Sequence, residues 1–121
     1  MADSITAEKS FKFAVRVINL YKFLVNEKRE YVMSKQLLRS GTSIGANVRE
    51  ALQAQSKRDF LNKINIALKE ANETQYWIEL LCVSDYISKK QKESIWIDSD
   101  EIIRLLVTIT KTTKRNIKNE E

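Results

Sequence analysis

Residues 39–51 read Arg39-Ser40-Gly41-Thr42-Ser43-Ile44-Gly45-Ala46-Asn47-Val48-Arg49-Glu50-Ala51 and form the middle of an amphipathic segment that covers about residues 33–55. Its apolar side chains recur at helical spacing, at Leu37, Leu38, Ile44, Val48, Ala51 and Leu52. Two glycines inside a helix, with the β-branched Thr42 between them, cost roughly 2 kcal/mol in helix propensity. Because Gly41 and Gly45 stand one turn apart, they let a second backbone approach closely, which offsets that cost. A break in the helix at this point is the competing interpretation.

The composition of the whole chain also favours helices. It has 121 residues, no proline and no glycine besides these two, so it lacks the residues that hairpins and tight turns require. Sandwiches, barrels and glycine-rich phosphate loops are therefore disfavoured. The length suits one domain, and we expect residues 1–121 to form it.

A long helix is expected over residues 5–28, and it is apolar on two faces. One face carries Phe11, Val15, Ile18 and Val25, and the other carries Phe13, Val17, Leu20 and Leu24. A surface helix normally shows a single apolar stripe, and a broader one is covered on more than one side. The pattern favours a subunit interface on this helix. A deeply buried central helix is the alternative.

A third helix is expected over residues 56–88. Ser56 and Asp59 have approximately the spacing of a capping box at its start. Its core stripe is Phe60, Ile64, Ala67, Ala71, Ile78 and Cys82. Ala67 and Ala71 resemble a second seam of close packing.

A fourth helix is expected over residues 99–117, after a charged connector at residues 89–93. Asp98 with Glu101 has the spacing of a capping box, and Ile97 with Ile102 has that of a hydrophobic staple. Four long helices joined by short connections predict an all-α, antiparallel up-down-up-down bundle.

The net charge of +5 is concentrated in one part of the chain. Residues 28–63 include eight basic and three acidic residues, so the remainder is neutral overall. A second local excess lies near the C-terminus, at Arg104, Lys111, Lys114, Arg115 and Lys118. Basic clusters attract polyanions through counterion release. A solvated helix face is the alternative interpretation of each cluster.

Polar residues beside the apolar stripes suggest a structural network. Buried polar groups must be paired, and Arg39 or Arg49 can meet Glu70 or Glu73 across the second and third helices. The candidate polar members of this network are Asn47, Glu50, Glu70 and Glu73. A carboxylate di-metal site is disfavoured, because such bundles use Glu-x-x-His pairs and the chain has no histidine. We therefore expect no metal and no cofactor.

The absence of histidine also argues against an enzyme. It removes Ser-His-Asp and Cys-His catalysis. A helical ribonuclease is the sharpest enzyme alternative, but proton transfer would then fall to Glu or Lys, with no sign of a tuned pair. Cys82 stands in an apolar run and is expected to be inert core. A lone cysteine, no secretion signal and no long apolar run together favour a cytoplasmic protein that does not span a membrane.

Three stretches together resemble one known family. Residues 39–51 are followed by Ser56-Lys57-Arg58-Asp59-Phe60 and by Ile66-Ala67-Leu68-Lys69-Glu70-Ala71-Asn72-Glu73-Thr74-Gln75-Tyr76-Trp77. In this combination they are similar to the 23S rRNA intervening-sequence protein family, whose members are often described as four-helix-bundle proteins. Many members have proline where Gly45 stands, and Ala-Glu-Gly where Arg49-Glu50-Ala51 stands. These departures leave the functional branch of the family open.

The resemblance implies a four-helix bundle that assembles into a ring-like homopentamer. Relatives are encoded within intervening sequences of bacterial 23S rRNA genes. A similar protein is the accessory factor of diversity-generating retroelements, a basic pentameric barrel that binds nucleic acid and works with a reverse transcriptase. We therefore expect a non-enzymatic oligomer that binds nucleic acid, RNA in preference to DNA, without sequence specificity. The alternative is a structural adaptor that recruits a protein partner such as a reverse transcriptase.

The candidate phosphate contacts come from the two basic clusters. They are Arg39, Arg49, Lys57, Arg58 and Lys63, with Lys35 and Lys114 in second place. Phosphate contacts position a nucleic acid without reading its sequence. An arginine that is paired inside the bundle would leave this set.

Overall fold

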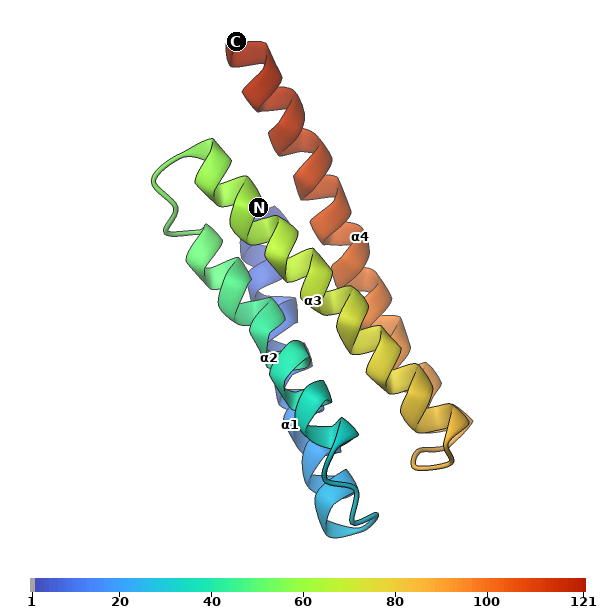
Figure 1. Cartoon of the computed structure of the whole chain (residues 1–121). Coiled ribbons are helices and arrows are strands. Elements are labelled where there is room, and N and C mark those ends of the chain that lie inside the picture. The colour runs from blue at the N-terminus through green and yellow to red at the C-terminus, as the bar shows by residue number, and fades with distance from the viewer. Residues whose placement is uncertain (1) are drawn as a thin grey trace.

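The computed structural model describes residues 2–121 and consists of helices. They are α1 (Ala2–Asn26), α2 (Met33–Ala51), α3 (Lys57–Val83) and α4 (Lys89–Glu120) (Figure 1). No strand occurs in this part of the chain. The prediction of an all-α protein with four helices is confirmed. Within the same residues, every helix lacks the long, nearly uncharged apolar run that a bilayer crossing requires.

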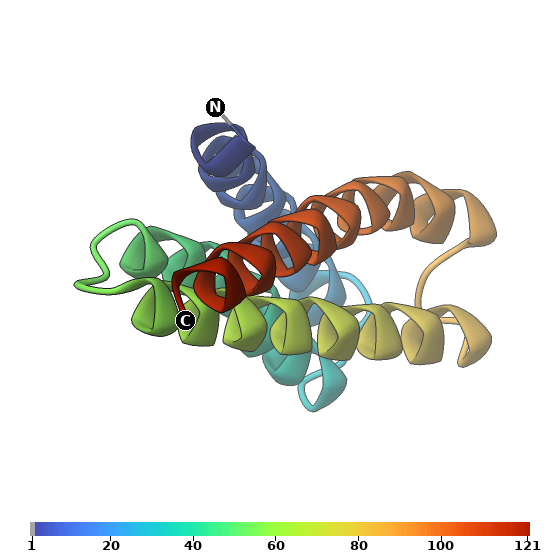
Figure 2. The same ribbon diagram turned by 90° about the horizontal axis from the view of Figure 1, so that it is seen from above.

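The helices pack around one apolar core. α2 lies between α1 and α3, α4 packs against α3, and the contact between α1 and α4 is the smallest of the four (Figures 1 and 2). Every helix supplies fully buried side chains, among them Phe13, Val17, Leu37, Ile44, Ile64, Ile78, Ile102 and Leu106. Burying each of these stabilises the fold by about 1.5–3 kcal/mol relative to exposure.

Only one of the two apolar faces of α1 points into the bundle. Phe13, Val17 and Leu24 are buried, whereas Phe11 and Val15 are 56% and 43% exposed. The alternative of a deeply buried central helix is therefore wrong for this chain. α1 therefore carries an apolar surface that faces outward.

α2 runs without interruption through both glycines, so the alternative of a broken helix is wrong. A Cβ atom at Gly41 would lie 2.7 Å from both methyl carbons of Val17 on α1. Real Cβ atoms do not approach other carbons so closely, and only glycine fits there. A Cβ atom at Gly45 would lie 3.4 Å from Ser10, which is ordinary contact. The two glycines therefore differ: Gly41 sets the α1–α2 distance and Gly45 does not.

α4 begins ten residues earlier than the sequence pattern predicts, at Lys89. Ser88 is its N-cap and forms a complete capping box with Gln91. The backbone N–H of Ser88 donates to the Gln91 side-chain oxygen at 2.8 Å, and the backbone N–H of Gln91 donates to the Ser88 hydroxyl at 3.1 Å. Residues 89–93, expected as a connector, form the first turn. Asp98 lies inside the helix, where its carboxylate accepts a hydrogen bond from Arg16 of α1 at 2.7 Å. Ile97, the expected staple residue, is 65% exposed.

α3 ends at Val83, five residues before the predicted end. Asp85 has a φ of 66°, in the left-handed region that stops a right-handed helix. The backbone N–H of Tyr86 then donates to the carbonyl of Leu81 at 2.9 Å, which satisfies the last turn. Ile87 is buried and closes this end of the core.

A buried carboxylate caps the start of α2. Glu30 is 7% exposed and accepts hydrogen bonds from the backbone N–H groups of Val32, Met33 and Ser34 at 3.1, 3.0 and 2.7 Å. Arg29, with a φ of 53°, turns the chain just before Glu30, whose carboxylate lies over the N–H groups of the residues that follow it. Burial acts to raise the pKa of Glu30, but the three backbone hydrogen bonds outweigh it and lower the pKa below its ordinary value.

The two glycines give opposite expectations for alanine. Gly41→Ala should lower the free energy of unfolding by about 1–3 kcal/mol, because the new methyl group overlaps the buried Val17 side chain. Gly45→Ala should be neutral or stabilise the monomer by up to about 1 kcal/mol, because alanine favours the helix. Urea denaturation followed by circular dichroism measures both.

The double variant Val17→Ala/Gly41→Ala is the control for the steric explanation. Removing the valine methyl groups makes room for the new Cβ, so the double variant should be more stable than the sum of the two single changes predicts. Additive losses would contradict the contact between these two positions.

Glu30→Gln should lower the free energy of unfolding by about 1–2 kcal/mol at pH 7, since it removes a charged acceptor from three backbone donors. The folded pKa of Glu30 is lowered, so its contribution is complete above the unfolded pKa, about 4.3, and is lost as the pH falls through the folded value. The difference between wild type and variant should therefore shrink below about pH 4. A difference that stays constant from pH 7 to pH 3 would contradict the capping role.

Candidate nucleic-acid interface

The start of α3 and the end of α4 meet at one end of the bundle (Figures 1 and 2). Ser56 is the N-cap of α3, as expected, and its hydroxyl accepts the backbone N–H of Asp59 at 3.0 Å. Lys57 and Arg58 follow immediately. They form ion pairs with Glu120 and Glu121 respectively. The sequence predicts none of these pairs, because the partners are 63 positions apart.

We call Lys57 and Arg58 at the start of α3, together with Lys114, Arg115 and Lys118 in the last turns of α4, the end cluster. All five side chains are exposed, and Lys114 forms no ion pair within residues 2–121. The ion pairs of Lys57 and Arg58 line a pocket of about 300 Å³ that also includes Ser56 and Ile117. Ion pairs this exposed contribute about 0–1 kcal/mol each. A phosphate group can therefore replace either carboxylate at little cost.

Two other candidate lysines lie apart from the end cluster. Lys63 on α3 forms an ion pair with Glu50 on α2 at 3.3 Å. Lys35 is exposed on the first turn of α2 and makes no ion pair in the described chain. Neither is brought next to Lys57 or Arg58 by a contact that the structure records.

Arg39 joins α2 to α3. Its guanidinium donates to Glu70 at 3.2 Å and to Glu73, so it bridges two carboxylates one turn apart on α3. Both carboxylates are more buried than the arginine. Because Arg39 faces two carboxylates that are more buried than it is, a phosphate replaces them less readily than the exposed partners of Lys57 and Arg58.

Trp77 completes this network, although the sequence pattern did not include it. Its indole N–H donates to Glu73 at 3.0 Å, and its ring packs edge-on against Tyr76 with centroids 5.0 Å apart. The pKa of Glu73 lies below its ordinary value, first because of the Trp77 hydrogen bond and also because of Arg39. The signal in the sequence is the i,i+4 spacing of Glu73 and Trp77, which places both side chains on one helix face.

Asn47 and Glu50, predicted as members of the same network, lie elsewhere. The Asn47 amide donates to the carbonyl of Ser43 at 2.9 Å, one turn earlier in α2. Glu50 is the partner of Lys63. The structure thus brings Arg39, Glu70 and Glu73 together and leaves Asn47 and Glu50 outside.

Arg49 has an apolar neighbour in place of an acidic one. Its guanidinium lies over the ring of Phe11, 5.7 Å from the centroid, as in a cation–π contact. Both residues border a groove of about 490 Å³ between α1 and α2, whose walls include Ala14, Ile18 and Ala46. We call it the α1–α2 groove. Two of its lining residues, Phe11 and Ile18, belong to the apolar face of α1 that points outward.

The site residues offer no metal-binding arrangement. Within the described residues, no three cysteine, aspartate or glutamate side chains cluster in the way that metal ligands do. The acidic side chains near the candidate cations are engaged in ion pairs with them. What the arrangement can do chemically is exchange those carboxylates for other anions.

Comparison with known proteins settles the family. The family model of the 23S rRNA-intervening sequence protein matches residues 2–108. The chain belongs to this family. The match extends from the start of α1 into α4 and includes all the residues that carry the resemblance.

A solved structure supports the same fold for this 23S rRNA-intervening sequence protein. It is a crystal structure, at 1.70 Å resolution, of a protein of unknown function from the S23 ribosomal protein family of Bacteroides thetaiotaomicron. The two chains are 66% identical, with a TM-score of 0.91, over 92% of this chain and 99% of the other. No curated protein matches the chain.

Proposed function

We propose that this family member is a non-enzymatic, cytoplasmic protein that binds nucleic acid, RNA in preference to DNA, as a homo-oligomer. In this proposal the helices form an antiparallel up-down-up-down bundle, and five copies form a ring. Binding is to phosphates, needs no cofactor and reads little sequence. The observation that carries the proposal is the end cluster, with its exposed cations opposed by two carboxylates of α4.

The structure supports phosphate contact over base recognition. Sequence-tolerant base stacking uses exposed aromatic rings beside the cations. At the end cluster, none of the described residues that line the pocket is aromatic. Trp77 and the exposed Tyr76 lie far along α3 from Lys57. The exposed Phe11 beside Arg49 lies in the α1–α2 groove. A single end cluster has few charges. Several linked copies raise the overall avidity by 10²-fold or more, so an oligomer converts a weak patch into a useful one.

The α1–α2 groove supports the oligomer. Phe11 and Ile18 are exposed apolar side chains of α1 that line the groove with the small residues Gly45 and Ala46 of α2. A contiguous apolar face of this kind is typical of a protein interface. We therefore assign the contact between copies to this groove, in agreement with the homopentamer that the family resemblance implies.

A second candidate function is an adaptor that recruits a protein partner, such as a reverse transcriptase. The observation that favours it is a separate cleft between α1 and α4, lined by cations but by no carboxylate. The adaptor and the RNA-binding function use different surfaces, so they can be tested separately.

The end cluster should dominate RNA affinity. Titrating the protein against a labelled RNA hairpin and a DNA duplex, from about 50 to 300 mM salt, should give binding with a steep negative log–log slope. Lys57→Glu/Arg58→Glu should weaken RNA binding about tenfold or more and make the slope shallower, since phosphate contacts are lost. No binding at the lowest salt, by a protein that is oligomeric, would rule out the proposed function.

Two matched variants separate local contacts from net charge. Lys22→Glu/Lys89→Glu makes the same charge change at exposed lysines that have no ion pair in residues 2–121, and it should weaken binding much less. Glu120→Gln/Glu121→Gln should strengthen binding more than Glu27→Gln/Glu93→Gln, because only the first pair opposes Lys57 and Arg58. Equal effects within either comparison would assign binding to overall charge alone.

Disrupting the α1–α2 groove should dissociate the oligomer. Phe11→Glu/Ile18→Lys keeps the net charge and leaves the core intact, since both side chains face outward. Light scattering after size-exclusion chromatography should show an oligomer for wild type and a folded monomer for the variant. The control Val83→Lys/Ile97→Glu replaces two apolar residues elsewhere that are even more exposed, at 76% and 65%, and it should keep the oligomer. Dissociation of the control alone would move the interface away from the groove.

A further inference from the structure

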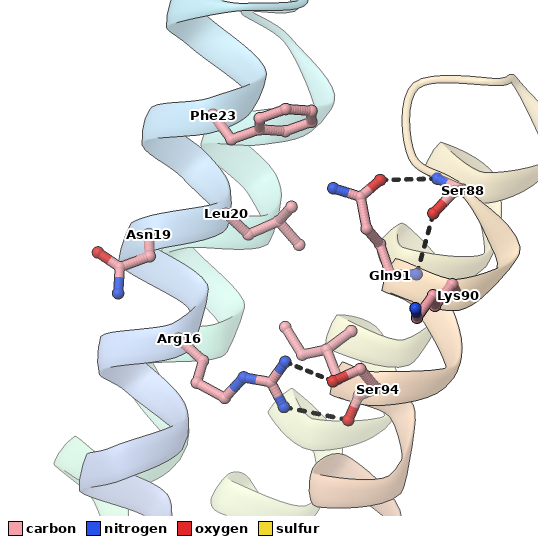
Figure 3. Close-up of a pocket in the computed structure, with 9 residues that line it drawn as sticks. Arg16, Asn19, Leu20, Phe23, Ser88, Lys90, Gln91 and Ser94 are labelled. Carbon is pink, nitrogen blue, oxygen red and sulfur yellow. Dashed lines mark hydrogen bonds between the residues drawn. The ribbon is translucent and has the colours of Figure 1, made fainter.

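The side of the bundle between α1 and α4 is only partly closed. One part of this seam is tied by ion pairs from Lys9 to Glu101 at 3.0 Å and from Arg16 to Asp98 at 2.7 Å. Beyond Arg16, towards the end of α1 and the start of α4, a cleft of about 530 Å³ remains open (Figure 3). We call it the α1–α4 cleft. It is distinct from both the end cluster and the α1–α2 groove.

The floor of the α1–α4 cleft is apolar. Leu20 and Phe23 extend from α1 towards α4, as Figure 3 shows, and Ile95 lines the cleft from the other side. Leu20 and Phe23 are packed against the core but remain partly exposed. The floor therefore suits one or two aliphatic side chains of a ligand.

The rim of the cleft offers hydrogen-bond donors and positive charge. The Gln91 side-chain oxygen already accepts the backbone N–H of Ser88 at 2.8 Å, so the amide turns its NH₂ group towards α1 (Figure 3). Lys90 lines the cleft and has no ion pair in the described part of the chain. Arg16 is held by Ser94 and Asp98 at the boundary. No carboxylate is among the lining residues, so the positive charge of Lys90 has no counter-charge in the cleft and favours an anionic ligand.

We propose that the α1–α4 cleft is the docking surface for an acidic amphipathic helix of a protein partner. The partner's apolar face packs on Leu20 and Phe23, and a carboxylate on its flank binds the Lys90 ammonium and the Gln91 amide. The inference rests on the adaptor function, and it is independent of RNA binding at the end cluster.

A protein helix fits the observations better than the other occupants. Small-molecule sites bury most of their ligand, whereas this cleft is open along one side between two helices. An RNA strand would place phosphates where the floor is apolar. Two helices that leave a gap on one side of a bundle form the groove in which a third amphipathic helix packs. The charge of the rim selects an acidic one.

The test uses a fluorescein-labelled 16-residue helical peptide with one leucine stripe flanked by glutamates, and a second peptide with lysine in place of each glutamate. Fluorescence anisotropy with the full-length protein should show binding of the acidic peptide and at least tenfold weaker binding of the basic one. Lys90→Glu should weaken the acidic peptide about tenfold and strengthen the basic peptide. This exchange of preference also establishes that the variant is folded. Lys22→Glu, an equal charge change outside the cleft, should alter neither.

Four results would overturn the proposal. They are equal binding of the two peptides, no binding of the acidic peptide at 200 µM protein, equal effects of Lys90→Glu and Lys22→Glu, and a change in oligomer mass caused by Lys90→Glu. The last would make the cleft an interface between copies. A fifth result would also overturn it: if single-stranded RNA competes with the acidic peptide and Lys90→Glu abolishes RNA binding, the cleft is an RNA site. Failure of the RNA proposal is measured separately. It would appear as equal RNA affinities of the Lys57→Glu/Arg58→Glu variant and its control, Lys22→Glu/Lys89→Glu.

Discussion

The close contact between Gly41 of α2 and Val17 of α1 sets the geometry of the whole bundle. A Cβ atom at position 41 would overlap the methyl groups of Val17 while the two helices keep this distance and Val17 keeps its side chain. Once α1 is this close, Phe13, Val17 and Leu24 fill the interior, and the other apolar face of the same helix is left outside. The α1–α2 groove lies on this outer side, where Gly45 is part of its lining. The helix propensity lost at Gly41 is recovered as packing, since interiors close-packed in this way gain dispersion contacts along the full length of both helices.

On the opposite side of α2, polar contacts fix how α3 lies. The Thr74 hydroxyl hydrogen-bonds that of Ser40 at 3.0 Å in the core, and Arg39 reaches Glu70 and Glu73 just outside it. Apolar packing alone tolerates a shift of one helix along another, because aliphatic surfaces are non-directional. Hydrogen bonds do not tolerate such a shift, because a buried hydroxyl or carboxylate that loses its partner costs about 1–3 kcal/mol. The apolar contacts therefore drive association of α2 and α3, and these polar ones select a single register.

Sequence reasoning predicted the four helices and the uninterrupted α2, because apolar periodicity over long segments is a strong signal. It misplaced the start of α4 because Ser88 with Gln91 and Asp98 with Glu101 both have capping-box spacing, and local spacing cannot reveal that Asp98 is taken by Arg16. The cap by Glu30 was missed, since it depends on a left-handed turn at Arg29. For the candidate interface, the sequence identified the cations but not their carboxylate partners: the pairs of Lys57 and Arg58 exist only after α3 and α4 have packed.

The position of Arg49 over Phe11 connects two properties that are otherwise separate. The guanidinium sits on the ring that lines the α1–α2 groove, so a second copy packed there changes the surroundings of that positive charge. Any anion that binds Arg49 then has different affinities for the free chain and the assembled one. Thermodynamic linkage makes such an effect reciprocal: the anion shifts the association equilibrium by the same factor. In an oligomer assembled as proposed, the amount of bound polyanion would therefore regulate how many copies are assembled.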